Sequence, residues 1–87
     1  MTIAVNIKHE KCDVYCGRGS PFGNYYVIGR DGTRADVIEK YRVWFNKRLT
    51  DPEFRDKVLS LKGKRLGCYC KPLNCHLDVI IEFLENL

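Results

Sequence analysis

The sequence predicts a small single α/β domain over residues 1–87, with a short, mostly parallel sheet, an N-terminal hairpin strand and about three helices. Three observations favour this class. A chain of 87 residues is too short for two independent cores. Segments rich in β-branched residues alternate with segments of helical periodicity. Their order (strand, loop, helix, helix, strand, helix) predicts a right-handed crossover between two parallel strands.

Two strands are expected before the first helix, and one after the second. Residues 3–7 (IAVNI) and 12–16 (CDVYC) are rich in β-branched and aromatic side chains, with the charged turn KHEK between them. Because the two segments are so close in the chain, they are expected to pair as a hairpin. The third strand, over residues 64–70 (KRLGCYC), has few polar side chains and is expected at the centre of the sheet.

Each expected helix has a start signal. Thr33 is a natural N-cap, and Asp36 completes a capping box three residues later. The motif TDP at residues 50–52 starts a second, shorter helix, with its threonine or aspartate as cap, and Gly63 ends that helix. Asn74 is expected to cap the third helix, which is the most apolar of the three.

The composition is typical of a soluble cytoplasmic protein. Hydrophobic residues make up 45% of the chain, no run approaches the ~20 apolar residues of a membrane span, and the start MTIAVNIKHEK is unlike a signal peptide. The net charge of +4 is uneven, because the residues after Lys71 sum to -3 and the remainder to +7. Arg18, Arg30 and Arg34 belong to this basic part. They predict a pocket for an anionic ligand, with a solvated surface as the alternative.

The first candidate binding segment is the loop GRGSPFGN, residues 17–24. Its glycines permit close approach of the backbone to a ligand, and its arginine suits a phosphate or carboxylate. It matches neither the Walker loop nor the dinucleotide fingerprint, and a structural turn is the alternative. The candidate ligand-binding residues here are Gly17, Arg18, Gly19, Ser20, Gly23 and Asn24.

The second candidate segment is GCYCKPLNCH, residues 67–76. On a strand, the thiols of Cys68 and Cys70 face the same side. Cys75 and His76 are expected in the first turn of the last helix, where the helix dipole lowers the pKa of a thiol. If the protein is an enzyme, Cys75 or Cys70 is the expected nucleophile, with His76 or Asp31 as general acid or base.

The cysteines also have a metal interpretation. Five cysteines in a reducing compartment do not predict a disulfide framework, whereas three thiols and an imidazole within nine residues are typical zinc ligands. The spacing C-x-C-x4-C-H differs from the two separated pairs of standard structural sites, and packing as small hydrophobic residues is the alternative. The expected zinc ligands are Cys68, Cys70, Cys75 and His76, with Cys12, Cys16 and His9 as substitutes.

The topology predicts that the two segments meet. Parallel neighbours that end near Cys16 and Cys70 have their carboxyl ends at one edge of the sheet, where open α/β sheets bind ligands. The segment 30–34 precedes the first helix and is expected at the same edge. Arg30, Asp31, Arg34 and Asn74 therefore complete the predicted ligand-binding set, and Phe22, Tyr25 or Tyr26 is expected to stack on a base.

The chain resembles the domain of unknown function 4326 family, which occurs in phages and bacteria. The resemblance runs from about Val5 to Leu84, through the motifs G-R-x-S-x-(F/W)-G-N, I-G-R-D-G-T-R and C-x-C-x4-C-H. It implies a small Rossmann-like three-layer domain, similar to domain of unknown function 488, with a nucleotide-type ligand. Tyr25 departs from the family pattern, in which proline is usual. The matching motif residues are Gly17, Arg18, Ser20, Gly23, Asn24, Arg30, Asp31, Gly32, Arg34, Cys68, Cys70, Cys75 and His76.

Two functions follow from these patterns. The first is binding, with or without turnover, of a small nucleotide-like anion, as a phage protein acting on a host or phage nucleotide in the host cytoplasm. The second is a zinc-stabilised interaction module for nucleic acid or a host protein, which ranks lower because the chain lacks a dense basic helix or a reader motif. Tyr41 and Trp44 are expected in the core, with a homodimer face as the alternative.

Overall fold

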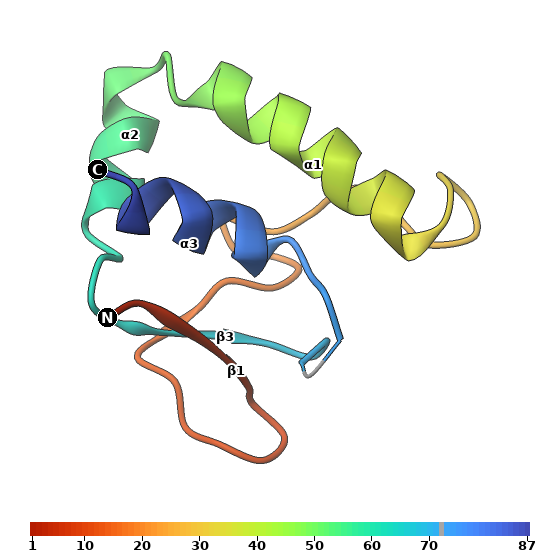
Figure 1. The fold of residues 1–87 in the computed structure, drawn as a ribbon, viewed down its shortest axis with the longest axis horizontal. Coiled ribbons are helices and arrows are strands. Elements are labelled where there is room, and N and C mark those ends of the chain that lie inside the picture. The colour runs from red at the N-terminus through yellow and green to blue at the C-terminus, as the bar shows by residue number, and fades with distance from the viewer. Residues whose placement is uncertain (72) are drawn as a thin grey trace.

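A three-stranded parallel sheet lies at one side of the molecule (Figure 1). The computed structural model describes residues 1–71 and 73–87. The strands β1 (Ile3–Asn6), β2 (Val14–Tyr15) and β3 (Arg65–Cys68) are arranged in the order β1-β3-β2. Both outer strands are parallel to β3, which confirms the α/β class and the central place of β3.

The predicted N-terminal hairpin is wrong. β1 and β2 do not pair with each other, because β3 lies between them. In this arrangement the most apolar strand is hydrogen-bonded on both sides: Ile7 N–H donates to Cys68 O at 3.0 Å, and Cys16 N–H donates to Gly67 O at 2.9 Å. A hairpin would leave β3 with an unpaired edge, where its buried backbone groups would lack partners.

The helices are α1 (Arg34–Arg48), α2 (Pro52–Leu59) and α3 (Leu77–Glu85). The capping box of Thr33 and Asp36 is confirmed, and the Asp51 side chain caps α2. Asn74 does not cap α3, contrary to expectation. The helix begins after His76 without a side-chain cap.

The start of α3 is instead held by its own first turn. The Asp78 carboxylate accepts a hydrogen bond from the Cys75 N–H at 3.1 Å, and the Asp78 N–H donates to the Cys75 carbonyl at 3.0 Å. This pair satisfies backbone groups that a helix start leaves without partners. Cys75 and His76 therefore lie just before the helix, where the backbone turns back from the sheet.

The helices pack on one side of the sheet, and the loop that follows β1 lies on the other (Figure 1). The expected third layer, on the side of the sheet away from the helices, is therefore formed by this loop and not by a helix. The core between sheet and helices includes Leu66, Tyr41, Phe45, Leu77 and Ile80, each at most 1% exposed. Within the described residues, no helix is long and apolar enough to cross a membrane.

Candidate functional site

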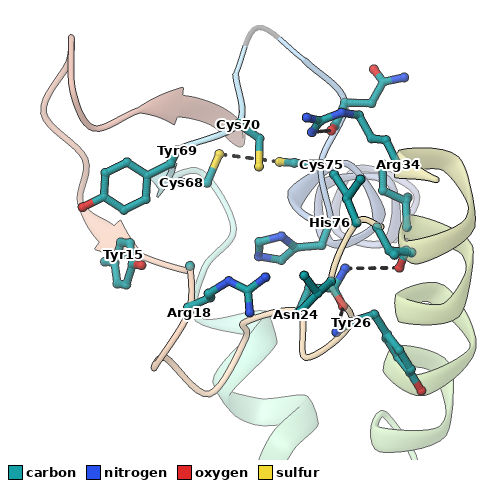
Figure 2. Close-up of a pocket in the computed structure, with 16 residues that line it drawn as sticks. Tyr15, Arg18, Asn24, Tyr26, Arg34, Cys68, Tyr69, Cys70, Cys75 and His76 are labelled. Atoms are coloured by element: carbon teal, nitrogen blue, oxygen red, sulfur yellow. Dashed lines mark hydrogen bonds between the residues drawn. The ribbon is translucent and has the colours of Figure 1, made fainter. Parts of the chain in front are cut away.

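A cavity of about 330 Å³ opens at the carboxyl ends of β2 and β3 (Figure 2). Its walls come from the residues after β2, the segment before α1, the first turns of α1, and the loop between β3 and α3. The lining residues are Tyr15, Gly17, Arg18, Asn24, Tyr26, Val27, Ile28, Arg34, Val37, Ile38, Cys68, Tyr69, Cys70, Asn74, Cys75 and His76. The predicted meeting of the glycine-rich and cysteine-rich loops is therefore observed.

Parallel pairing explains why distant residues share this cavity. β2 and β3 are in register with Tyr15 opposite Gly67, so the chain leaves both strands at the same edge. Arg18 and Cys75, which are 57 positions apart in the sequence, both line the cavity as a result.

The glycine-rich loop is compact, and its glycines serve two purposes. Gly19 has φ of +89°, a conformation that other residues rarely adopt. Gly23 instead lies against the start of the loop, where an added Cβ would be 2.6 Å from the Gly17 carbonyl oxygen. The Ser20 hydroxyl also donates to the Gly17 carbonyl, at 2.7 Å, which closes the turn. The expected turn is thus present, and it presents Arg18 beside the cavity.

Side chains tie the loop to the rest of the domain through backbone carbonyls. The Tyr41 hydroxyl of α1 donates to the Phe22 carbonyl at 2.8 Å, and the Asn24 amide donates to the Val37 carbonyl at 3.1 Å. The Asn24 side-chain oxygen accepts from Tyr26 N–H at 2.9 Å, so both ends of this amide are used. Asn24 therefore holds the loop in place, and because it also lines the cavity, its expected contact with a ligand stays a prediction.

The side chains of His76 and Arg34 also pair with backbone carbonyls of other segments. Nε2 of His76 is 2.7 Å from the Cys16 carbonyl oxygen, and the ring packs edge-on against Tyr41. Burial lowers the pKa of His76 from its ordinary value of 6.5, which favours the neutral imidazole. The Arg34 guanidinium donates to the Asn74 carbonyl at 3.0 Å, joining the start of α1 to the loop before α3.

Arg18 differs from these residues. Its side chain projects toward the cavity (Figure 2). Over residues 1–71 and 73–87 it makes no hydrogen bond or ion pair, and the residue is exposed. An arginine without a protein partner at a cavity wall is available to bind an anion.

Arg30 and Asp31 do not line the cavity. The Arg30 guanidinium pairs with the Asp31 carboxylate at 2.9 Å and donates to the Tyr25 carbonyl at 3.2 Å. The Arg30 hydrogen bond lowers the pKa of Asp31, and the Val27 N–H acts in the same direction. This pair shapes the turn before α1. Gly19, Ser20 and Gly23 likewise border a smaller neighbouring pocket of about 260 Å³ rather than the main cavity.

Of the three candidate stacking aromatics, only Tyr26 lines the main cavity. Phe22 is 6% exposed and packs on Phe54 in the core, so its expected stacking role is wrong. Tyr25 packs edge-on against Trp44.

The core assignment of Tyr41 is confirmed, since that residue is 1% exposed.

Three thiols gather at the cavity wall. The sulfurs of Cys68, Cys70 and Cys75 all lie within 4.8 Å of one another, and those of Cys68 and Cys75 are 3.5 Å apart. Burial raises the pKa of the Cys75 thiol, with Cys68 adding to the effect, so the expected low pKa of Cys75 is not found. A buried thiol with a raised pKa is a poor nucleophile in its protonated form.

The remaining expected metal ligands lie outside this group. His76 does not join the three sulfurs, because its ring is turned toward the Cys16 carbonyl. Cys12 and Cys16 are also outside the group, as is His9. Burial, with Cys12 and Cys68 contributing, raises the pKa of Cys16 to about 12.

Several cavity residues were not predicted from the sequence. Tyr15 and Tyr69 border the opening with ring centroids 6.3 Å apart, and Val27 and Ile28 supply apolar wall. Asn6, the last residue of β1, connects that strand to the loop between β3 and α3, because its side-chain amide donates to the Lys71 carbonyl at 2.8 Å. The signal for the two tyrosines was their position at or just beyond the carboxyl ends of β2 and β3.

An all-parallel three-stranded sheet, three helices and a cavity at the carboxyl edge define a small α/β domain with a candidate binding site. The chain belongs to the family described as Domain of unknown function (DUF4326), which matches residues 4–86. It is similar to the uncharacterized 12.4 kDa protein in the nrdA-td intergenic region of Enterobacteria phage T4, with 39% identity over 85 residues, covering 95% of this chain and 77% of the phage protein. No solved structure matches the chain.

Proposed function

We propose that the protein binds a small anionic, nucleotide-like ligand in the cavity at the carboxyl edge of the sheet. The observation that carries this proposal is Arg18, a cavity-lining arginine with no protein partner among the described residues. The cavity volume of about 330 Å³ falls within the range of small-molecule sites, roughly 300–1,000 Å³.

The walls favour a ligand with one charged end and one planar apolar part. Arg18 supplies a fork of donors for a phosphate or carboxylate. Val37 and Ile38 of α1 and the ring of Tyr26 supply an apolar wall on which a base or similar ring packs. Arg34 supports the same wall and adds a second positive charge.

The similar protein from phage T4 supports a phage setting for the proposed function. In that setting, the proposed role is that of a phage-encoded protein that acts on a host or phage nucleotide in the host cytoplasm. A zinc-stabilised interaction module ranks lower, because the clustered thiols face the same cavity rather than a separate surface. Binding alone is sufficient for the proposed function.

A thermal-shift screen tests the proposal with mononucleotides, ADP-ribose and cyclic dinucleotides at millimolar concentration. A ligand present at 100 times its Kd stabilises a protein by about 2.7 kcal/mol, which is readily detected. Stabilisation by at least one compound is expected. If none of them raises the Tm, the proposal is contradicted.

Two arginine variants then locate the binding site. Arg18→Ala should weaken the ligand identified in the screen by about 1.5–3 kcal/mol, the contribution of a hydrogen bond to a charged group, which is roughly 10- to 150-fold in Kd. Arg30→Ala is the matched control, because this arginine is nearby but pairs with Asp31 outside the cavity. Equal weakening by both variants, measured by calorimetry, would show that only the general positive charge matters.

A further inference from the structure

Three cysteines converge from two separate parts of the chain. Cys68 is the last residue of β3, Cys70 follows it by two positions, and Cys75 lies just before α3. Figure 2 shows the three sulfurs pointing toward one another at the cavity wall. Cys68 and Cys75 are buried, whereas Cys70 is half-buried.

The sulfur positions fit one metal ion. Ligands 2.3 Å from a tetrahedral zinc lie about 3.8 Å apart. The Cys68 and Cys75 sulfurs are 3.5 Å apart, and no pair in the group exceeds 4.8 Å. A movement of about 1 Å or less therefore brings all three sulfurs to zinc distance. Cys70 is the residue best able to move, because it is half-buried and follows the end of β3.

We propose that Cys68, Cys70 and Cys75 bind a zinc ion through three thiolates and leave its fourth coordination position open to the cavity. Within the described residues, no other cysteine, histidine or carboxylate joins the group. His76 is held away by its bond to the Cys16 carbonyl. Three protein ligands with one open position are typical of zinc sites that act on a bound molecule, whereas structural sites are closed by four.

The surroundings balance the charge of such a centre. Zinc with three thiolates carries a net charge of about -1, since each coordinated thiol is deprotonated. The positive charge of Lys71 acts on both Cys68 and Cys75, and the Leu77 N–H favours the thiolate form of Cys75. Lys71 is itself fixed by its ion pair with Asp78. The metal site stands independently of the nucleotide-like ligand, although both face the same cavity.

Metal analysis of the full-length protein tests the site directly. Protein purified under reducing conditions without added zinc should contain one zinc per chain. X-ray absorption should show three sulfur neighbours at about 2.3 Å and one lighter neighbour. Absence of bound zinc, together with no uptake from a zinc buffer, would overturn the proposal. Four sulfur neighbours would overturn the open position.

Two single variants provide a matched comparison. Cys70→Ser should weaken zinc affinity by more than about 100-fold, which exceeds the 10- to 100-fold effect of changes outside the coordination shell. Cys12→Ser is the control, because Cys12 is also a half-buried free cysteine but lies outside the group. Competition with a chromophoric chelator measures both, and circular dichroism verifies that each variant is folded. Equal zinc affinity in the two variants would refute the assignment.

The open position has its own readout. In the cobalt-substituted protein, azide or inorganic phosphate should change the visible absorption by occupying the fourth position, and an unchanged spectrum would refute it. The competing role for the same thiols is a Cys68–Cys75 disulfide. Two results together would favour that alternative over zinc. The intact mass would fall by two hydrogens after exposure to air, and the reduced protein would bind no zinc. None of these measurements uses a nucleotide, so this proposal and the proposed function fail separately.

Discussion

Replacement of Tyr41 by phenylalanine tests how the glycine-rich loop is held beside the cavity. The Tyr41 side chain is 1% exposed, and its hydroxyl donates to the Phe22 carbonyl at 2.8 Å. Burial raises the pKa of Tyr41, so the hydroxyl remains protonated and able to donate. Tyr41→Phe keeps the ring and its packing against Phe45 while leaving the Phe22 carbonyl without its donor.

The expected cost follows from that buried carbonyl. A buried acceptor that loses its donor destabilises a protein by about 1–3 kcal/mol. In a domain of this size, each kcal/mol lowers the Tm by about 4–8 °C. The free energy of unfolding, measured in urea, should therefore fall in Tyr41→Phe with an unchanged denaturant slope.

A second tyrosine provides the control. Tyr25 is 68% exposed, and its hydroxyl makes no hydrogen bond within residues 1–71 and 73–87, so Tyr25→Phe should change stability by less than about 0.5 kcal/mol. Amide hydrogen exchange should also become faster in residues 17–24 of Tyr41→Phe only. Equal stability and equal exchange in the two variants would refute the view that this bond fixes the loop.

Three further predictions concern backbone contact and pH. Gly23→Ala should destabilise the fold by about 1–3 kcal/mol in urea unfolding, because its Cβ would lie 2.6 Å from the Gly17 carbonyl oxygen. The Thr33 N–H lowers the pKa of Asp36 below its ordinary 3.8, so the contribution of Asp36 to stability is present above pH 3.8 and is lost as pH falls through the lower folded pKa. Asp36→Asn should remove that part of the pH profile. Burial lowers the pKa of His76 below 6.5, so the free energy of unfolding should decrease as pH falls below 6.5, and His76→Gln should abolish this decrease.

The local features of the fold were predictable because short segments determine them. Thr33 and Asp36 form their capping box from residues within one helical turn, and Asp51 caps α2 in the same way. The central position of β3 followed from its low polarity, and its parallel partnership with β2 followed from the crossover between them. The meeting of the two loops at the carboxyl edge followed from this topology, without any local rule that relates Arg18 to Cys75.

Features that depend on tertiary packing were not predictable. The hairpin expectation considered only the closeness of β1 and β2 in the chain, whereas β3 arrives 50 residues later and separates them. Cys75 was expected to have a low pKa at a helix start, but burial dominates over the nearby Leu77 N–H. His76 was expected to be catalytic or metal-binding. The partner that its ring nitrogen meets is the Cys16 carbonyl, 60 positions away in the sequence.

The distinction between supporting and binding residues depends on which polar groups already have partners. Asn24, Arg34 and His76 each bond to a backbone carbonyl of another segment, so they hold the walls of the cavity in place. Within the described residues, Arg18 has no such bond, and the sulfurs of Cys68, Cys70 and Cys75 lie within 4.8 Å of one another. Residues of the first kind are expected to affect stability when replaced, and residues of the second kind to affect binding. The cavity therefore combines walls held by hydrogen bonds with two groups, one guanidinium and one cluster of thiols, for which we propose partners from outside the chain.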